Sequence, residues 1–311
     1  MKIVITEPLS VSNEMLERLA QQLPEGTELV ISPDRTDDAG LIERAKDADI
    51  VVIANQKISD SVLLGWKSMK LLVVAFTGYD HVNVELLKSR GIPVCNCAGY
   101  STSAVADIVF AMTIDLMRNI VPCDRIVRQG GTKEGLVGPE LEGKTFGIIG
   151  TGAIGSRVAK IADAFGCRVI ACSRTEKQGL PVEYLPMDEV LRQSDILSVH
   201  VPSNAATRGM IGCEQLKLMK PTAILINTAR GPVVDSAALS QALQEGVIAA
   251  AGVDVFNAEP PLPADEPLLT APHTLLTPHI AFASDQAFEK RAAIVFGNIL
   301  AWMNGQPQNL V

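Results

Sequence analysis

The chain has 311 residues, a length that is typical of two domains rather than one. Hydrophobic residues make up 47% of the sequence and charged residues 20%, a balance that excludes global disorder and allows a large core. Acidic residues outnumber basic ones by 35 to 27 and no basic stripe stands out, so we expect no nucleic-acid partner.

The first hundred residues alternate between strand and helix patterns. The predicted strands cover 2–6, 27–32, 50–54, 71–76 and 92–95, and the predicted helices cover 13–23, 37–48 and 84–89. Aromatic residues are only 4% of the chain, so the core must consist mainly of Val, Ile, Leu and Ala. That composition suits parallel strands covered by helices on both faces, and this part therefore predicts a doubly wound α/β unit.

A long helix and a second α/β series follow. Ser101 is expected to cap an amphipathic helix whose apolar positions run from Ala104 to Leu116, and Gly130 and Gly131 end that region. Further strands are predicted over 145–149, 168–172, 196–200, 223–227 and 250–255, and a last helix from about 286 to 302. We therefore predict two α/β domains that join near residue 99.

The sequence shows no pattern that is typical of a membrane segment or a metal site. The first six residues predict a strand and lack the apolar run of a signal peptide. The most apolar stretch, 105–117, is interrupted by Asp107 and Asp115 and is too short to span a bilayer. The six cysteines show no ligand spacing, so we expect reduced thiols, no metal site, no membrane partner and a cytoplasmic location.

A glycine-rich turn stands between a strand and a helix start in Phe-Gly-Ile-Ile-Gly-Thr-Gly-Ala-Ile-Gly, which begins at residue 146. Gly150 permits a tight turn, Gly152 lets the backbone approach a pyrophosphate, and Gly155 lets the helix pack on the strand. Free amides at the helix start, which includes Ala153 and Ile154, would then bind phosphate. In this context the motif favours dinucleotide binding over a merely structural turn.

The end of the next strand bears on the choice between NAD and NADP. A carboxylate is expected there when the ribose 2′-hydroxyl of NAD is bound, but this chain has Ser173 and Arg174. A guanidinium pairs with a 2′-phosphate and a hydroxyl adds a hydrogen bond, so the sequence favours NADP(H), with NAD(H) as the alternative cofactor. In the other interpretation, Arg174 stacks on adenine and selects neither cofactor.

Three polar residues follow shortly after predicted strands, where open α/β sheets place their active sites. These are Arg230, Glu259 and His279. Of the other histidines, His81 in a loop and His200 at a strand end are expected to be structural. From the residues alone this placement only suggests a site, because each of the three could instead belong to a surface ion pair.

The segments around these three residues resemble the D-isomer-specific 2-hydroxyacid dehydrogenases. The motifs are Asn-Thr-Ala-Arg-Gly-Pro at 227–232, Asp-Val-Phe-Asn-Ala-Glu-Pro-Pro at 254–261 and Thr-Pro-His-Ile-Ala at 277–281, and the resemblance covers essentially the whole chain. It implies an NAD(P)-dependent oxidoreductase that interconverts a small 2-oxo acid and its 2-hydroxy acid. Within that family the chain is closest in appearance to glyoxylate/hydroxypyruvate reductases, which interconvert glyoxylate or hydroxypyruvate with glycolate or D-glycerate.

The resemblance makes His279 the acid/base, Glu259 its partner and Arg230 the anchor for the substrate carboxylate. Hydride addition to a ketone carbon builds negative charge on the oxygen, so a proton donor must lie within hydrogen-bond reach. A neighbouring carboxylate favours the imidazolium form of histidine and orients its ring. The planar fork of arginine suits a carboxylate.

Further contacts are implied by the same resemblance. The amides of Gly78 and Tyr79 would meet the substrate carboxylate, although a plain strand-to-helix turn is the alternative. Asp254 would lie near the nicotinamide carboxamide, or else be a buried structural carboxylate. The remaining cofactor contacts would come from Val201, Pro202, Thr207, Thr228 and Ala229.

The third carbon of the substrate would face Asn55 and Gln56, and also Tyr100 unless that residue packs at the domain junction. Relatives that act on phosphoglycerate carry an arginine near Ala54-Asn55-Gln56, and its absence there argues against a phosphorylated substrate, although Lys57 weakens that argument. Phe282 stands where many relatives carry a tryptophan, which implies a changed pocket size.

The family fold implies a discontinuous, flavodoxin-like substrate domain of residues 1–98 plus 287–311 and a Rossmann-like NAD(P)-binding domain of residues 99–286. The substrate would lie in the cleft between them, and a homodimer would form across the helix after residue 100. One alternative is a D-lactate or D-3-phosphoglycerate dehydrogenase of the same family. Another, from a different class, is a corepressor-like protein that senses the dinucleotide.

Overall fold

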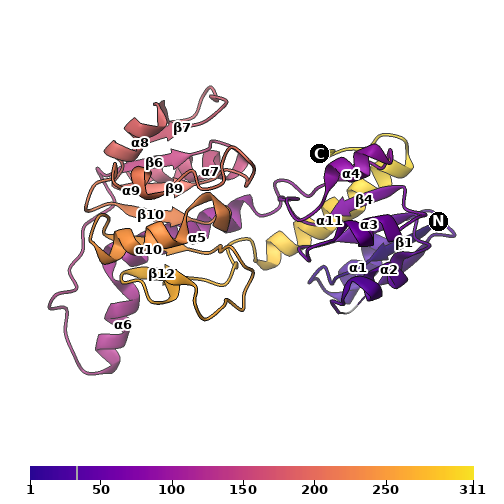
Figure 1. Ribbon diagram of the computed structural model, residues 1–311, viewed down its shortest axis with the longest axis horizontal. Helices are drawn as coiled ribbons and strands as arrows, with labels where there is room; N and C mark the ends of the chain where they lie inside the picture. The colour runs from indigo at the N-terminus through magenta and orange to yellow at the C-terminus, as the bar shows by residue number, and fades with distance from the viewer. Residues whose placement is uncertain (33) are drawn as a thin grey trace. The chain divides into compact units, whose positions relative to one another are not determined.

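The computed structural model describes residues 1–32 and 34–311, and the chain divides into two compact units (Figure 1). One unit contains Met1–Ser101 and Ala283–Val311, and the other contains Thr102–Phe282. Each unit has its own parallel sheet with helices packed against it, so the predicted pair of doubly wound α/β units is confirmed.

The first unit is built on a five-stranded sheet in the order β2-β1-β3-β4-β5, which is the flavodoxin-like order. Its strands are β1 (Lys2–Ile5), β2 (Glu28–Ile31), β3 (Ile50–Ile53), β4 (Leu71–Val74) and β5 (Val94–Cys95). Every residue of β3 and β4 is buried, as expected for central parallel strands covered on both faces. All five predicted strands are present; four are shortened by one or two residues at one end, and β2 is shortened by one residue at each end.

The helices of this unit are α1 (Asn13–Ala20), α2 (Asp38–Ala45), α3 (Asp60–Gly65), α4 (Val84–Ser89) and α11 (Asp285–Met303). Each begins after a side chain that accepts a hydrogen bond from a backbone amide of its first turn; these caps are Ser12, Asp37, Ser59, Asn83 and Ser284.

Helix α11, near the end of the chain, is an integral part of the first unit. Buried Arg291 donates to the carbonyl of Leu9 over 2.8 Å, and buried Asn298 donates to the carbonyl of Asn96 over 2.8 Å. The last helix thereby completes a sheet whose strands all lie in the first hundred residues.

The second unit has a seven-stranded parallel sheet in the order β12-β11-β10-β9-β6-β7-β8. Its strands are β6 (Thr145–Ile149), β7 (Arg168–Cys172), β8 (Glu183–Tyr184), β9 (Ile196–Val199), β10 (Ile224–Asn227), β11 (Ala250–Val253) and β12 (Thr274–Leu276). The strand order reverses between β6 and β9, and open α/β sheets bind ligands at the carboxyl ends of the strands at such a point.

The helices of the second unit are α5 (Thr102–Arg118), α6 (Ile120–Arg128), α7 (Ala153–Ala164), α8 (Met187–Gln193), α9 (Cys213–Leu216) and α10 (Ser236–Gln244). The region that we expected to be one long helix breaks at Asn119, whose φ of 54° is left-handed. Helix α5 buries its apolar positions in the core, whereas α6 has no buried residue and extends away from the sheet (Figure 1). Across the described ranges 1–32 and 34–311, none of the helices is long and apolar enough to cross a membrane.

Candidate active site

The predicted dinucleotide motif lies at the reversal of the second sheet, between the ends of β6 and β9. Gly150 has a φ of 94°, and a Cβ there would come within 2.6 Å of the carbonyl oxygen of His200. A Cβ on Gly155 would come within 2.0 Å of the carbonyl oxygen of Gly150, so only glycine lets α7 begin this close to the turn. The turn is therefore compact because its glycines have no side chains.

The start of α7 fits a bound pyrophosphate. Gly152 is the N-cap and supplies no side chain to the first amides, which include those of Ala153 and Ile154. A Cβ on Gly152 would meet nothing within 4 Å, so the space in front of these amides is open. Directly after β10, the hydroxyl of Thr228 is buried and has no hydrogen-bond partner among the described residues. A polar ligand would accept hydrogen bonds from the first amides of α7 and from the hydroxyl of Thr228.

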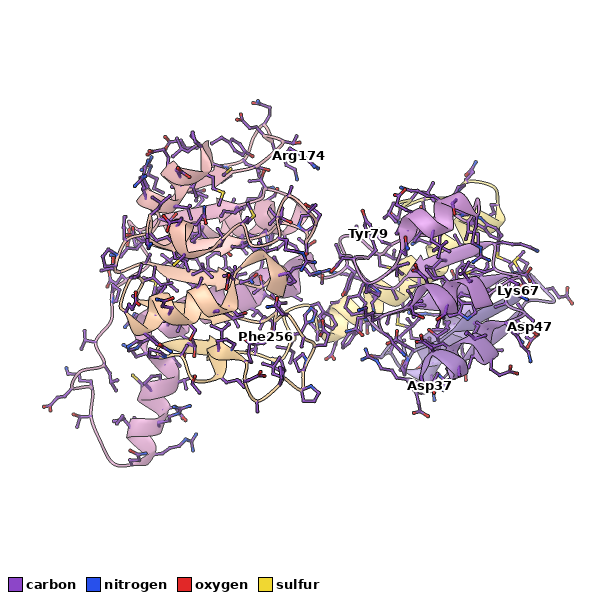
Figure 2. The ribbon with its side chains drawn as sticks, viewed as in Figure 1. Asp37, Asp47, Lys67, Tyr79, Arg174 and Phe256 are labelled. Atoms are coloured by element: carbon purple, nitrogen blue, oxygen red, sulfur yellow. The ribbon has the colours of Figure 1, made fainter. Side chains whose placement is uncertain are left out.

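Two cations lie beside this turn. The amide of Thr151 donates to the hydroxyl of Ser173 over 3.3 Å, which fixes the end of β7 against the turn, and the next residue, Arg174, is exposed (Figure 2). The Nζ of Lys177 donates to the hydroxyl of Ser156 in the first turn of α7 over 3.2 Å. Sequence reasoning missed Lys177 because no pattern along the chain relates it to α7.

The other predicted cofactor contacts come from the loops after β9 and β10. The hydroxyl of Thr207 donates to the carbonyl of Pro202 over 2.5 Å and accepts from the amide of Asn204 over 2.9 Å, so one turn holds these residues beside Val201. Ala229 directly precedes Arg230 on the loop after β10. These loops follow adjacent strands of the sheet.

His279 and Glu259 form an ion pair in the second unit. The Nδ1 atom of His279 lies 2.8 Å from Oε2 and 3.0 Å from Oε1 of Glu259. The imidazole is 18% exposed and the carboxylate 57% exposed. Because Nδ1 faces the carboxylate, Nε2 is the ring nitrogen that can meet a substrate oxygen.

Asp254 shapes the segment that carries His279. Its carboxylate is fully buried and accepts hydrogen bonds from the hydroxyl of Thr277 over 2.5 Å, the amide of Ile280 over 2.8 Å and the amide of Ala281 over 2.9 Å. These donors flank His279, whose backbone is left-handed with a φ of 55°. The contacts favour a structural role for Asp254, the second of the two alternatives that the sequence left open.

Arg230 lies on the adjacent loop, after β10. Asn227, a residue that sequence reasoning did not single out, shapes this loop by accepting from the amide of Ala229 and donating to the carbonyl of Arg230, each over 3.1 Å. The Nη1 of Arg230 donates to the carbonyl of Ala229 over 2.8 Å. A Cβ on Gly231 would lie 2.0 Å from the backbone of Phe256, so the Arg230 loop packs directly on the segment that leads to Glu259.

The fold thus brings together the three residues that the sequence proposed as catalytic. They follow β10, β11 and β12, three neighbouring strands, and so share one edge of the sheet. Phe282 stands next to them, with its ring centroid 5.5 Å from that of His279 at an interplanar angle of 85°.

The predicted substrate residues of the first unit follow β3 and β4. Tyr79, labelled in Figure 2, is 40% exposed on the loop after β4, next to Gly78. The ring of His81 lies 2.9 Å from the carbonyl of Ala54, which ties this loop to the one that carries Asn55.

Tyr100 is only 3% exposed in the first unit. Its ring centroid lies 6.0 Å from that of Phe76 in an edge-on arrangement, and the guanidinium of Arg291 lies 6.0 Å from its centroid. This environment favours packing over substrate contact, again the second alternative from the sequence.

An arginine lies beside Asn55 in the fold, which the sequence did not predict. No arginine lies near Asn55 along the chain, but the fold brings Arg35 from the loop after β2, and its Nη2 donates to the Oδ1 atom of Asn55. The Nε atom of Arg35 also donates to Oε2 of buried Glu7 over 2.9 Å. The lack of an arginine in the chain segment therefore says nothing about charge at this position.

His200 is a structural histidine, as the sequence suggested. Its Nε2 lies 2.8 Å from the hydroxyl of Ser198, and burial of the ring lowers its pKa from 6.5 to about 3. The ring is therefore neutral at physiological pH and takes no part in charge at the neighbouring turn.

The model of the D-isomer-specific 2-hydroxyacid dehydrogenase NAD-binding domain matches residues 110–281, which include the glycine-rich turn, Arg230, Glu259 and His279. The chain belongs to this family. The dehydrogenase therefore uses a nicotinamide dinucleotide and acts on 2-hydroxy or 2-oxo acids, and its second unit is the Rossmann-type NAD-binding domain.

Similar proteins span the whole dehydrogenase. A glyoxylate reductase of Korarchaeum cryptofilum is 39% identical over 97% of this chain and 94% of its own. A solved NADPH-dependent glyoxylate/hydroxypyruvate reductase of Sinorhizobium meliloti, in complex with NADP and malonate, is 31% identical with a TM-score of 0.86 and covers 100% of this chain and 96% of its own. An acyclic imino acid reductase in complex with NADPH and D-Arg is 30% identical over both complete chains, with a TM-score of 0.93.

Proposed function

We propose that this dehydrogenase reduces glyoxylate and hydroxypyruvate to glycolate and D-glycerate and that it prefers NADPH. The observation that carries the proposal is the His279–Glu259 ion pair, which lies at the same sheet edge as Arg230 and the glycine-rich turn. The names of the relatives from Korarchaeum cryptofilum and Sinorhizobium meliloti support this substrate class.

The bound cofactor would supply the hydride to the carbonyl carbon. Protonated His279 would donate a proton from Nε2 to the carbonyl oxygen as negative charge develops there. Glu259 holds Nδ1, so it orients the imidazole ring and keeps Nε2 directed away from the carboxylate. Arg230 and the amides of Gly78 and Tyr79 would bind the substrate carboxylate. After the proton is transferred, the neutral imidazole takes up another from water.

The preference for NADPH rests on the exposed guanidinium of Arg174 at the end of β7. Residues 173–175, which directly follow the strand, include no carboxylate to accept from a ribose 2′-hydroxyl, and Ser173 supplies a hydroxyl instead. The Nζ of Lys177, held at the first turn of α7, adds a second positive charge to the same side of the motif. Both charges favour a 2′-phosphate.

A homodimer is part of the proposal. The exposed apolar residues of the second unit include Ile120, Val121 and Val127 of α6 and Val137 of the following loop. Val127 is 70% exposed and Val137 is 82% exposed, and aliphatic side chains left this open to solvent support an interface. We expect a second copy to cover them, with α6 rather than α5 supplying most of the apolar contact.

Steady-state rates with four acids test the function: glyoxylate, hydroxypyruvate, pyruvate and phosphohydroxypyruvate, each with NADPH and with NADH. Hydroxypyruvate should exceed phosphohydroxypyruvate in kcat/KM by at least about tenfold. A preference for pyruvate or for the phosphorylated acid would instead support a lactate or phosphoglycerate dehydrogenase. Dinucleotide binding without turnover of any acid would support a sensing protein.

The role of His279 is tested separately. His279→Ala should lower kcat by about 10²–10⁴-fold, the usual contribution of a positioned acid/base. The dissociation constant for NADPH should stay near the wild-type value because the glycine-rich turn is untouched. A fully active variant would show that another group supplies the proton.

A further inference from the structure

We propose that Arg35 is a specificity-determining residue that, together with Asn55, recognises the hydroxyl on the third carbon of hydroxypyruvate. The inference rests on the proposed function and names a residue that lies outside every motif of the family resemblance. Arg35 reaches Asn55 only through the fold, since 20 residues separate the two along the chain.

A buried carboxylate fixes the position of Arg35. Glu7 follows β1, is 3% exposed, and accepts through Oε1 from the amides of Ala54 and Gln56 over 2.9 and 3.2 Å. Its Oε2 accepts from the Nε of Arg35 over 2.9 Å. One carboxylate therefore holds both the loop that carries Asn55 and the guanidinium beside it.

The strand order places this cluster next to the loop proposed to bind the carboxylate. The sheet runs β2-β1-β3-β4, so Arg35, Glu7, Asn55 and Gly78 follow four consecutive strands at one edge. Neighbouring strands lie about 4.8 Å apart, which sets the spacing of adjacent loops. A 2-oxo acid whose carboxylate binds at Gly78 would have its third carbon within reach of the next loop, at Asn55.

The hydrogen bonds within this cluster leave mainly N–H donors, from Asn55 and Arg35, to meet a ligand. Arg35 occupies the Oδ1 of Asn55, so the amide group at Nδ2 is the part of Asn55 that remains for a ligand. Arg35 has five N–H donors, of which Nε is used by Glu7 and one on Nη2 by Asn55. The guanidinium side chain is 56% exposed, so its other donors are accessible. Such a surface suits an oxygen that accepts hydrogen bonds.

The charge balance favours a hydroxyl over a phosphate. The positive charge of Arg35 is already compensated by the carboxylate of Glu7, so the pair has no net charge to offer a doubly charged group. A neutral hydroxymethyl group can accept from the same donors at little desolvation cost. Glyoxylate has no third carbon and gains nothing from this contact.

The test is the ratio of kcat/KM for hydroxypyruvate to that for glyoxylate, measured with NADPH. Arg35→Met should lower this ratio about tenfold, because the variant keeps an unbranched apolar stem but removes every donor. The loss should appear mainly in KM for hydroxypyruvate. Arg35→Lys should recover part of the ratio, because its ammonium still pairs with Glu7 and donates hydrogen bonds.

Arg168→Met is the matched control. Arg168 donates to Glu183 from Nε and Nη2 over 3.2 and 2.6 Å, but it lies at the start of β7, at the opposite end of that strand from the carboxyl edge. In Arg168→Met, the ratio of kcat/KM for hydroxypyruvate to that for glyoxylate should equal the wild-type ratio. If Arg35→Met does not fold because Glu7 loses its partner, Glu7→Gln combined with Arg35→Met removes both charges and should give the same lowered ratio.

The outcomes separate this inference from the proposed function. Turnover of both acids by the wild type, with equal losses for both in Arg35→Met, would overturn the specificity role and leave the proposed function intact. A wild type that turns over neither acid would overturn both. A selective loss with hydroxypyruvate supports both.

Discussion

Gly231 offers the sharpest test of how the acid/base pair and the carboxylate anchor are held together. A Cβ at this position would lie 2.0 Å from the carbonyl carbon and oxygen of Phe256 and 2.6 Å from the amide nitrogen of Asn257, all of them backbone atoms. Ordinary contacts of a Cβ begin at 3.4 Å, so Gly231→Ala must push the two loops apart by about 1.4 Å. One loop carries Arg230 and the other leads to Glu259.

A displacement of about 1 Å in catalytic groups costs roughly 10²-fold in rate, so we expect kcat/KM for glyoxylate to fall about 100-fold. Overpacking should also lower the free energy of unfolding by about 1–3 kcal/mol, measured by urea denaturation. Binding of NADPH should weaken less than kcat/KM falls, because the glycine-rich turn lies on another loop and only the proposed Thr228 and Ala229 contacts share the loop of Gly231. Gly297→Ala, within α11, is the control: its Cβ would meet nothing closer than 3.5 Å, and activity should be unchanged. A Gly231→Ala variant with the kcat/KM of the wild type would show that catalysis does not depend on close packing between the backbones of these two loops.

Four further outcomes follow from the described contacts. Asp254→Asn places an amide against the backbone N–H of Ala281, so the free energy of unfolding should fall by about 1.5–3 kcal/mol in denaturation measurements. The segment around His279 should also loosen, so kcat should drop in rate measurements. Arg174→Ala should reduce the ratio of kcat/KM with NADPH to that with NADH about tenfold; an unchanged ratio would assign selectivity elsewhere. Burial holds the pKa of His200 near 3 in the folded protein, against 6.5 in the unfolded chain. The stability that this group contributes above pH 6.5 should therefore be lost at up to about 1.4 kcal/mol per pH unit as the pH falls toward 3. His200→Asn should flatten that pH dependence in acid titrations. Val127→Asp should shift the protein toward monomers in sedimentation velocity, whereas an unchanged mass would exclude α6 from the interface.

Local patterns predicted the fold where a single physical rule decides the outcome. The strands β6 and β7 have the residues that the sequence predicted, because a short apolar run bounded by polar or glycine residues leaves little choice of register. Helix α4 was likewise predicted at its observed residues, whereas its cap, Asn83, is known only from the structure. The strands β8 and β12 were missed: β8 has two residues and β12 is only half-buried, so neither leaves a clear apolar run.

The sequence could predict the site residues whose position along the chain relates to a strand, but not those whose role depends on contacts made in the fold. The residues Arg230, Glu259 and His279 were singled out because each follows a strand, a feature that is visible in the sequence. The contributions of Asp254 and Asn227 come from side chains that hold the loops, and only the hydrogen bonds reveal which backbone groups they serve. Arg35 was missed for a related reason, since its partner Glu7 is 28 residues away and nothing in either neighbourhood indicates the pair.

The place of α11 has a consequence for biosynthesis. The first unit contains Met1–Ser101, yet its buried Arg291 and Asn298 contacts form only after the whole second unit has been synthesised. Domains usually fold from the N-terminus onward during synthesis, but here the continuous second unit, Thr102–Phe282, is the first to have all its residues outside the ribosome. The nascent chain therefore carries an unfinished five-stranded sheet through most of translation. We expect its apolar surface to be the region of this enzyme that most depends on chaperones.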